Sequence, residues 1–271
     1  MPTAAILIRG SISYRRDAFD AGLRRLGYDV QFTPQRDPGP GDLLVSWNRM
    51  RDQEPLIRRH IAEGAIVIIA ENGLIGIDDD GQKFYCLSLE HHNGAGRWDT
   101  EDGVRRACDL LDRIDLKPWR RPEAGKHILV LPQRGIGEQG VAQPRGWTGN
   151  IVARLRQVTD RPLRIRPHPG AKASYTTPVG DLDGAWAAVV WASSAGIKSI
   201  VAGYPVFHEF KHFYGRGAAR FGIEDVEDCF TGDRIPMLRD VACAQWSASE
   251  IATGEPFKRL IALHERTRDA A

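Results

Sequence analysis

The sequence predicts an α/β protein built from two doubly wound domains with a cleft between them. Apolar runs that do not alternate with polar residues, such as residues 66–70, indicate strands buried on both faces of a parallel sheet. Helical patterns separate these runs, as a doubly wound fold requires. Two prolines and a glycine interrupt the pattern within residues 117–126, and the pattern then starts again. We therefore expect a linker there.

The elements follow in order along the chain. In the first half, strands are predicted at residues 4–8, 29–32, 43–47 and 66–70, and helices at 14–26, 53–63 and 102–114. In the second half, strands are predicted at 127–131, 163–165, 187–191 and 205–207, and helices at 149–158 and 195–202. A last helix is predicted at 247–267, with Ser247 or Ser249 as its N-cap and Glu250 in its first turn. The predicted organisation is an N-terminal domain (1–116), a linker (117–126), a C-terminal domain (127–246) and a C-terminal helix (247–271).

The composition is that of a globular protein, with 42% hydrophobic and 27% charged residues. No apolar run approaches the roughly 20 residues that span a membrane. The N-terminus lacks the basic and apolar segments of a secretion signal. The four cysteines lack the spacing of a zinc site and suit a reducing compartment. We therefore expect a cytoplasmic protein that needs no metal.

The net charge of +2 requires no polyanionic partner, but 30 of the 37 basic residues are arginines. Arginine binds phosphate through planar, bidentate donors. A GC-rich genome that favours arginine codons is the alternative explanation. Charge alone therefore does not indicate a nucleic-acid-binding protein.

Two motifs in the second half follow apolar runs. The first is Arg-Pro-His-Pro-Gly at residues 166–170, and the second is Ser-Ser-Ala-Gly at 193–196, followed by Gly-Tyr-Pro-Val at 203–206. Ligands of open α/β sheets bind at the carboxyl ends of strands, and helix N-termini there hold phosphate. In this interpretation His168 contacts a phosphate oxygen with Arg166 beside it, and Ser193, Ser194 and Gly196 open a phosphate-binding helix. The alternatives are a proline-rich turn with an incidental histidine and an ordinary serine N-cap. The order of the motifs favours a nucleotide site.

Two further positions belong to this predicted donor site. Arg134 and Gly135 follow the first strand of the second half, where the backbone approaches a ligand and the arginine counters a diphosphate. Glu209 follows the strand at 205–207 and is expected to hold a ribose or sugar. A flexible loop and an exposed carboxylate are the respective alternatives.

These motifs together resemble the donor half of GT-B glycosyltransferases. The capsule-polysaccharide type is most similar, with the sialyl- and Kdo-transferases and glycerophosphotransferases that share His-Pro and Ser-Ser elements. The resemblance implies two Rossmann-like domains and a nucleotide-sugar donor of UDP or CMP type, without a further cofactor. It also implies that His168, Ser193 and Ser194 contact the nucleotide phosphates. Many relatives carry an acidic residue where this chain has Lys198.

Three other stretches, at residues 92–98, 133–137 and 245–251, resemble uncharacterised phage-type members of this group, so that the resemblance covers roughly residues 65 to 260. It makes a hydroxymethylated base in phage DNA the favoured acceptor, in the cytoplasm of the host. A flipped base and gripped phosphates would then make binding weaken steeply with salt. A cell-surface or lipid-linked glycan is the competing acceptor.

Transfer to a hydroxyl needs a base in the first half. The candidates are Glu71, at the end of the predicted strand 66–70, His92 and Asp99. A loop-fixing role is the alternative for Glu71 and for His92. Tryptophans that stack on an acceptor and polar residues beside them complete the predicted acceptor site, which comprises Trp47, Asn48, Arg49, Asn93, Arg97 and Trp98. Tryptophans packed at strand ends are the alternative. Residues 78–81 (Asp-Asp-Asp-Gly) lack the ligand spacing of a calcium loop and predict a β-turn.

Two other functions remain open. A nucleotide-sugar epimerase has the same two-domain fold and would convert the donor without an acceptor. A nucleotide-sensing or DNA-binding protein of this fold would bind a nucleotide without turnover.

Overall fold

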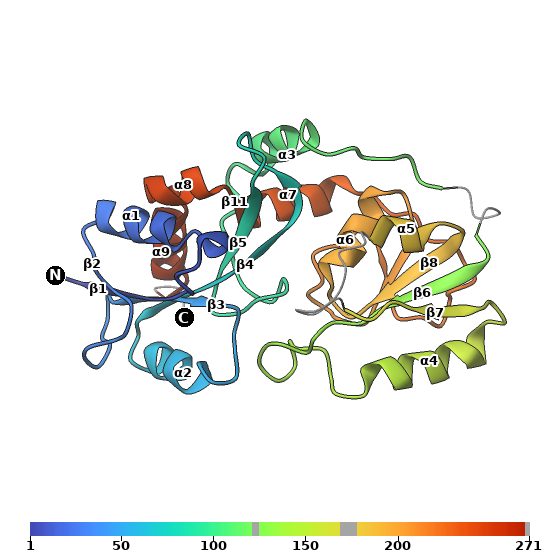
Figure 1. Cartoon of the computed structure of the whole chain (residues 1–271), viewed down its shortest axis with the longest axis horizontal. Coiled ribbons are helices and arrows are strands. Elements are labelled where there is room, and N and C mark those ends of the chain that lie inside the picture. The colour runs from blue at the N-terminus through green and yellow to red at the C-terminus, as the bar shows by residue number, and fades with distance from the viewer. Residues whose placement is uncertain (121–124, 169–177, 269–271) are drawn as a thin grey trace. The chain divides into compact units, whose positions relative to one another are not determined.

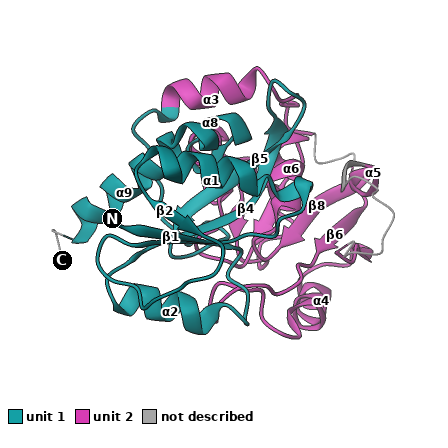
Figure 2. Ribbon diagram, turned by 60° about the vertical axis from the view of Figure 1, so that its left-hand side comes forward, with its two compact units in different colours: residues 1–103, 242–271 teal, residues 104–241 magenta. Residues whose placement is uncertain are grey.

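The computed structural model describes residues 1–120, 125–168 and 178–268. The chain forms two compact units (Figure 2): a first unit of Met1–Gly103 with Ala242–Ala271, and a second unit of Val104–Val241. The boundaries differ from those expected from sequence, because the chain enters the second unit at residue 104 and its C-terminal residues belong to the first. The predicted linker lies within the second unit, and its residues 121–124 are outside the described residues.

In the described part of the first unit, six strands form one sheet in the order β11-β5-β4-β3-β1-β2 (Figure 1). The parallel strands are β1 (Thr3–Leu7), β2 (Asp29–Gln31), β3 (Leu43–Trp47) and β4 (Ile66–Ile77). The antiparallel strands are β5 (Lys83–Leu89) and β11 (Gln245–Trp246). The four strands predicted from apolar runs are therefore confirmed, and the antiparallel edge is an addition.

Helices cover both faces of this sheet (Figure 1). On one face lie α1 (Arg16–Arg25), α8 (Ala248–Thr253) and α9 (Glu255–Arg268), and on the other lies α2 (Glu54–Ala62). Phe19 of α1 and Phe257 of α9 are fully buried against the strands. The single C-terminal helix predicted from sequence is two helices, because Gly254 ends α8 in a left-handed conformation (φ +86°). Ser247 caps α8 and forms a capping box with Glu250.

The β4–β5 hairpin was not predicted from the sequence. The predicted strand 66–70 continues to Ile77, and the chain then turns back into β5. The backbone N–H of Asp78 donates to the carbonyl oxygen of Gln82 at 2.7 Å, and the Asp78 carboxylate accepts the Gln82 N–H at 2.7 Å. The β-turn predicted at residues 78–81 is therefore confirmed.

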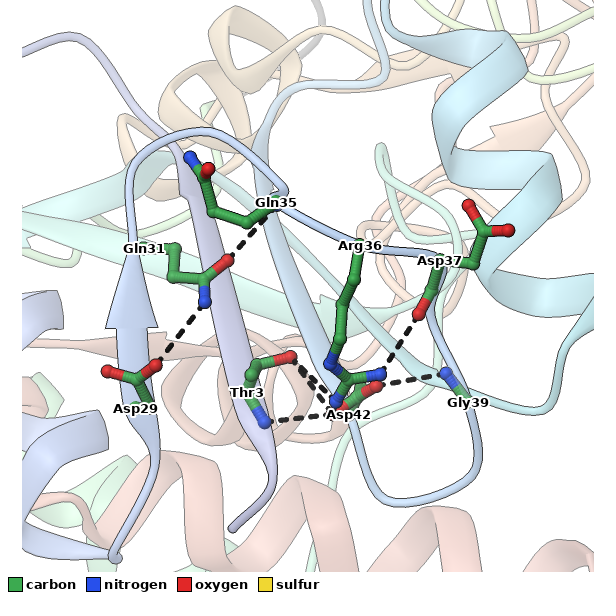
Figure 3. A network of polar contacts seen from close by, with 8 residues as sticks. All are labelled: Thr3, Asp29, Gln31, Gln35, Arg36, Asp37, Gly39 and Asp42. Atoms are coloured by element: carbon green, nitrogen blue, oxygen red, sulfur yellow. Dashed lines mark hydrogen bonds and ion pairs between the residues drawn. The ribbon is translucent and has the colours of Figure 1, made fainter.

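A polar network fixes the amino ends of β1 and β3 (Figure 3). Asp42 is 4% exposed, and its carboxylate accepts the Thr3 N–H at 2.8 Å and the Gly39 N–H at 2.9 Å and pairs with Arg36 at 2.6 Å. Burial alone would raise the pKa of Asp42, but these hydrogen bonds hold it below its ordinary value. The carboxylate thus sets the register of the two central strands from their amino ends.

In the described part of the second unit, five parallel strands form a sheet in the order β10-β9-β8-β6-β7. They are β6 (His127–Leu131), β7 (Leu163–Ile165), β8 (Ala185–Val190), β9 (Val206–His208) and β10 (Arg220–Phe221). The helices are α3 (Gly103–Leu111), α4 (Trp147–Val158), α5 (Pro178–Leu182), α6 (Ser194–Val201) and α7 (Ile235–Ala244). The first and last of these, α3 and α7, each cross a boundary between the units. Trp147, Ile151 and Leu155 of α4 pack on one face, and α6 packs beside β8.

Both sheets share one strand order among their first four strands: the second strand is outermost, followed by the first, third and fourth. In a doubly wound sheet of this order, the chain reverses its direction of winding between the first and third strands. That switch point lies between β1 and β3 in the first unit and between β6 and β8 in the second. No helix of the described residues is long and apolar enough to span a membrane.

Candidate functional site

The donor-site residues expected from sequence lie at the carboxyl edge of the second sheet. Arg134 and Gly135 follow β6, Arg166 and His168 follow β7, Ser193, Ser194 and Gly196 follow β8, and Glu209 follows β9. Because these strands are parallel, their carboxyl ends share one edge. The loops after β6 and β8 flank the switch point, where an open α/β sheet binds its ligand.

Gln133 joins these two loops and was not among the residues expected from sequence. Its side-chain oxygen accepts the backbone N–H of Ala192 at 3.0 Å. The backbone N–H of Gln133 donates to the side-chain oxygen of Gln143 at 2.7 Å. The Trp191 indole N–H donates to the carbonyl oxygen of Val141 at 2.9 Å, which ties the same segments a second time. The signal in the sequence was its position, two residues after a buried strand. Gln133 therefore sets the distance between the two loops at the switch point.

The loop after β8 leads directly into α6. Ser193 is the N-cap, with extended backbone angles (φ −66°, ψ 140°), and its hydroxyl accepts the Ala195 N–H at 3.1 Å. Ser193 is buried and Ser194 is half-buried. The hydroxyl of Ser193 is thus used as a cap, and its O–H remains a donor. The N–H groups of Ala195 and Gly196 already bond to Ser193, so the hydroxyl and N–H of Ser194 and the helix dipole remain to attract an anion.

Gly196 faces the interior of the second unit. A Cβ at this position would lie 3.0 Å from Phe213 Cζ and 3.1 Å from Val190 Cγ2. The absence of a side chain therefore lets α6 approach β8. Gly196 supports the phosphate-binding helix by packing, whereas the sequence suggested that it lines the ligand.

His168 and Arg134 act on each other across the edge. His168 is exposed, yet desolvation and the positive charge of Arg134 lower its pKa below the ordinary value. The charge of Arg134, in the loop after β6, thus acts on the His168 imidazole in the loop after β7. A phosphate between the two would compensate the positive charge of Arg134 and of a protonated His168. Pro169 and Gly170 of the motif lie outside the described residues.

Two residues expected to bind the donor are held by protein groups instead. Arg166 is half-buried and forms an ion pair with Asp181 of α5. The Glu209 carboxylate accepts the Trp147 indole N–H at 2.8 Å and pairs with Arg154, both on α4. Glu209 therefore anchors α4 to the loop after β9.

In the first unit, Trp47 ends β3 and Asn48 and Arg49 follow it. Asn48 has a left-handed backbone (φ 55°), and its N–H donates to the Ala70 carbonyl oxygen at 2.8 Å. The Arg49 side chain is buried and pairs with Glu54 of α2 at 2.7 Å, and it also donates to the Glu90 carbonyl oxygen at 2.9 Å. Arg49 therefore ties the loop after β3 to α2 and the loop after β5. It is not exposed for an acceptor, as sequence had suggested.

Glu71 is the first residue beyond the parallel pairing of β4 with β3, which ends at Ala70. The strand itself continues, so the expectation that Glu71 ends it is corrected. The Asn93 backbone N–H donates to Glu71 Oε1 at 3.0 Å, and Asn93 has a left-handed backbone (φ 55°). Glu71 also raises the pKa of the Cys86 thiol, after the larger effect of burial. A left-handed backbone in a non-glycine residue, such as that of Asn93, occurs often at functional sites. The neighbouring His92 is buried, 2% exposed.

Residues 97–99 do not lie beside Glu71 and Asn93. Trp98 packs against the core beneath α8 and α9, and Asp99 forms ion pairs with Arg259 at 3.6 Å and Arg266 at 3.9 Å, both on α9. Glu71 lies on the opposite face, because strand alternation places it with Val67 and Ile69 beside α2. Arg97 pairs with Glu90 at 3.0 Å. The structure therefore brings Glu71 and Asn93 together and separates Asp99 from them.

No group of three or more histidine, cysteine, aspartate or glutamate side chains in the described ranges has the geometry to hold a metal ion.

Two doubly wound units with parallel sheets define the class of protein as mixed α/β. No family model and no curated protein matches the chain in sequence. Solved structures with a similar fold include two chains described as KpsC of Thermosulfurimonas dismutans. One, a beta Kdo 2,4 transferase, has a TM-score of 0.53 and 14% identity over 89% of this chain and 90% of that chain.

The other, a beta Kdo 2,7 transferase, has a TM-score of 0.54 and 14% identity over 97% of this chain and 99% of that chain. At this identity the similarity shows the fold. It agrees with the resemblance to capsule-polysaccharide and Kdo transferases found in the sequence motifs.

Proposed function

We propose that this protein is a glycosyltransferase that moves a sugar from a nucleotide-activated donor to an acceptor hydroxyl. The observation that carries the proposal is the convergence of three loops at the switch point of the second sheet. The Gln133–Ala192 hydrogen bond joins the loops after β6 and β8, and the charge of Arg134 reaches His168 after β7. The fold shared with two Kdo transferases supports the same function.

The second unit binds the donor in this proposal. Arg134 and His168 neutralise the phosphate, and Ser194 with the N-terminus of α6 donates hydrogen bonds to it. Groups that stabilise negative charge on the phosphate lower the barrier to its departure. The donor is a nucleotide-sugar of UDP or CMP type, and neither a metal nor another cofactor takes part.

The first unit supplies the base. Glu71 takes the proton from the acceptor hydroxyl, and the Asn93 N–H orients its carboxylate at 3.0 Å. In a single displacement, the acceptor oxygen forms a bond to the anomeric carbon while the bond from that carbon to the phosphate oxygen breaks. The electron pair leaves with the nucleotide. His92 is the alternative base.

A glycan is the better supported acceptor. Arg49 and Trp98 were expected in the acceptor site, and they are a buried clamp and a half-buried residue packed against the core. The two solved structures with a similar fold are named as Kdo transferases, so Kdo belongs among the donor sugars to be tried. DNA with hydroxymethylated bases remains the competing acceptor.

The donor site is tested by thermal shift with UDP, CMP, CDP, GDP and their sugar conjugates. A ligand at about 100 times its Kd stabilises the folded state by roughly 2.7 kcal/mol. We expect one nucleotide class to raise the melting temperature of the wild type but not that of His168→Ala. His264→Ala, on α9 of the first unit, is the matched control and should respond like the wild type. No response to any nucleotide would refute the donor site.

Turnover then separates the remaining functions. Release of the nucleotide that depends on an added glycan supports the transferase. Dependence on hydroxymethylated DNA would identify the other acceptor. Conversion of the donor without an acceptor would show an epimerase, and binding without turnover would show a nucleotide-binding protein.

A further inference from the structure

Lys83, at the start of β5, lies against three aromatic rings of the first unit. Its Nζ atom is 5.8 Å from the ring centroid of Tyr14, 5.7 Å from that of Trp47 and 5.3 Å from that of Tyr85. The Tyr14 and Trp47 rings contact each other edge to face, with centroids 4.8 Å apart and planes at 90°. Ammonium groups within about 6 Å of a ring are attracted to its face. We call these four residues the aromatic–lysine cluster.

The cluster lies at the switch point of the first sheet. Trp47 is the last residue of β3, and Tyr14 belongs to the short helix η1 (Ile12–Tyr14) that follows β1. These are the two strands between which the winding reverses. Ligands of open α/β sheets bind in this position. The aromatic–lysine cluster therefore occupies the place in the first unit that the proposed phosphate site occupies in the second.

The three rings of the cluster differ in their exposure. Tyr85 is 2% exposed and packs in the core, whereas Tyr14 and Trp47 are half-buried. Rings that are partly exposed at a ligand position offer apolar area to the C–H groups of a sugar. The cluster was missed in the sequence, apart from Trp47, because its members are as far as 71 positions apart in the chain.

The charge of Lys83 is not balanced within the cluster. Nζ donates to the Asn72 side-chain oxygen at 2.6 Å, and no carboxylate of the described residues pairs with it. An ammonium has three donors, so two remain for a ligand. Lys83 as a whole is exposed, and the partial burial of its ammonium lowers its pKa. An anionic ligand would supply the missing counter-charge.

We propose that the aromatic–lysine cluster is a saccharide subsite of the first unit, at the same sheet edge as Glu71 but on the other face, and that it binds a sugar residue carrying an anionic group, a carboxylate or a phosphate. The inference rests on the proposed function, since it names the class of saccharide that the first unit takes. The sugar ring packs on Tyr14 and Trp47, and Lys83 pairs with its anionic group. Asn72 holds the ammonium in place.

Binding without any nucleotide tests the proposal by isothermal titration calorimetry at low salt. The probes are tetragalacturonic acid, neutral maltotetraose and glucose 6-phosphate. We expect at least one anionic probe to bind the wild type at least tenfold more tightly than maltotetraose. Lys83→Met should remove that difference, whereas Lys258→Met, an exposed lysine of α9, should preserve it. Trp47→Phe should weaken anionic and neutral probes alike.

Tight binding of tetragalacturonic acid identifies a carboxylate, and tight binding of glucose 6-phosphate identifies a phosphate. Equal binding of neutral and anionic probes, no binding of any probe, or an unchanged difference in Lys83→Met overturns the proposal. So does binding of single-stranded DNA through Lys83 without saccharide binding. Because the binding test contains no donor, its result is independent of the donor site. Loss of the nucleotide response at His168 would refute the proposed transferase and leave this subsite untouched, and failure of saccharide binding would refute the subsite and leave the donor site untouched.

Discussion

The lowered pKa of His168 makes the affinity for a phosphate depend on pH. The free protein holds the pKa of His168 below its ordinary value, through desolvation and the charge of Arg134. A bound diphosphate favours the protonated form and raises that pKa. Protons are therefore taken up on binding, so the affinity rises as the pH falls below neutral and declines as the pH rises through the pKa of the complex.

We expect NMR titration of the His168 ring to show a higher pKa with the bound nucleotide than without it. Calorimetry should show tighter nucleotide binding at pH 6 than at pH 8. His168→Asn should bind weakly with the same affinity at both pH values. An unchanged His168 pKa in the complex would mean that the phosphate lies elsewhere.

Glu71 and Asp99 make a matched pair of carboxylates in the first unit. Glu71→Gln keeps the shape and the hydrogen bond from Asn93 but removes the base, so kcat should fall by about 10²–10⁴-fold. Asp99→Asn weakens the ion pairs with α9, so it should lower the stability by on the order of 1 kcal/mol and leave kcat within a few fold. Steady-state kinetics and chemical denaturation measure the two effects. A larger loss of kcat in Asp99→Asn would reverse the assignment.

The sequence predicted which loops these residues occupy but not the partners of their side chains. His168, Ser193 and Ser194 follow strands whose ends meet at one edge, and strand order alone predicts that. Glu209 and Arg154 are 55 positions apart, and Arg49 and Glu90 are 41 apart. Contacts at such separations depend on how helices pack on the sheet, which no local pattern encodes. A carboxylate or guanidinium in a ligand loop therefore looks alike in sequence whether it binds substrate or anchors a helix.

Among the elements, the strands with continuous apolar runs were predictable, because burial on both faces leaves a clear pattern. β5 was not predicted, although its Phe-Tyr-Cys-Leu run is continuous and every residue after the exposed Lys83 is buried. β10 and β11 have only two residues each in the structure and carry no periodic signal. α7 was missed as well. Its polar Arg239 and Asp240 interrupt the apolar residues at the point where the chain leaves the second unit.

The contact between α1 and α8 depends on Gly22. A Cβ at this position would overlap the carbonyl oxygen of Ile251 and lie 2.9 Å from Phe257 Cε2. Because backbone cannot move aside like a side-chain end, Gly22→Ala should destabilise the protein by about 1–3 kcal/mol or more. Gly149→Ala, in α4, meets nothing within 4 Å and should stabilise by about 0.5–1 kcal/mol. Thermal or urea unfolding of both variants measures the difference, and similar effects of the two would show that helix propensity dominates.

At the scale of the whole molecule, each unit has its own core. Phe257 of α9 is fully buried with residues of β1, β3 and β4, while the core under α4 uses residues of β6 and β8. Phe257→Ala should cost about 3–5 kcal/mol in the first unit. In hydrogen exchange we expect amides of β1, β3 and β4 to lose protection and those of β6 and β8 to keep it. Equal loss in both sheets would show that the two units unfold as one.

The return of the C-terminal residues to the first unit has a consequence for synthesis on the ribosome. Residues 1–103 emerge first, but Trp246, Ile251 and Phe257, which complete their core, are made last. Domains usually fold in the order in which they emerge. In this chain the order is reversed, since residues 104–241 are complete while the nascent first unit still exposes the apolar face of Phe19 and Leu23. The newly made N-terminal segment therefore depends on chaperones, or on rapid release of the finished chain, more than the middle of the protein does.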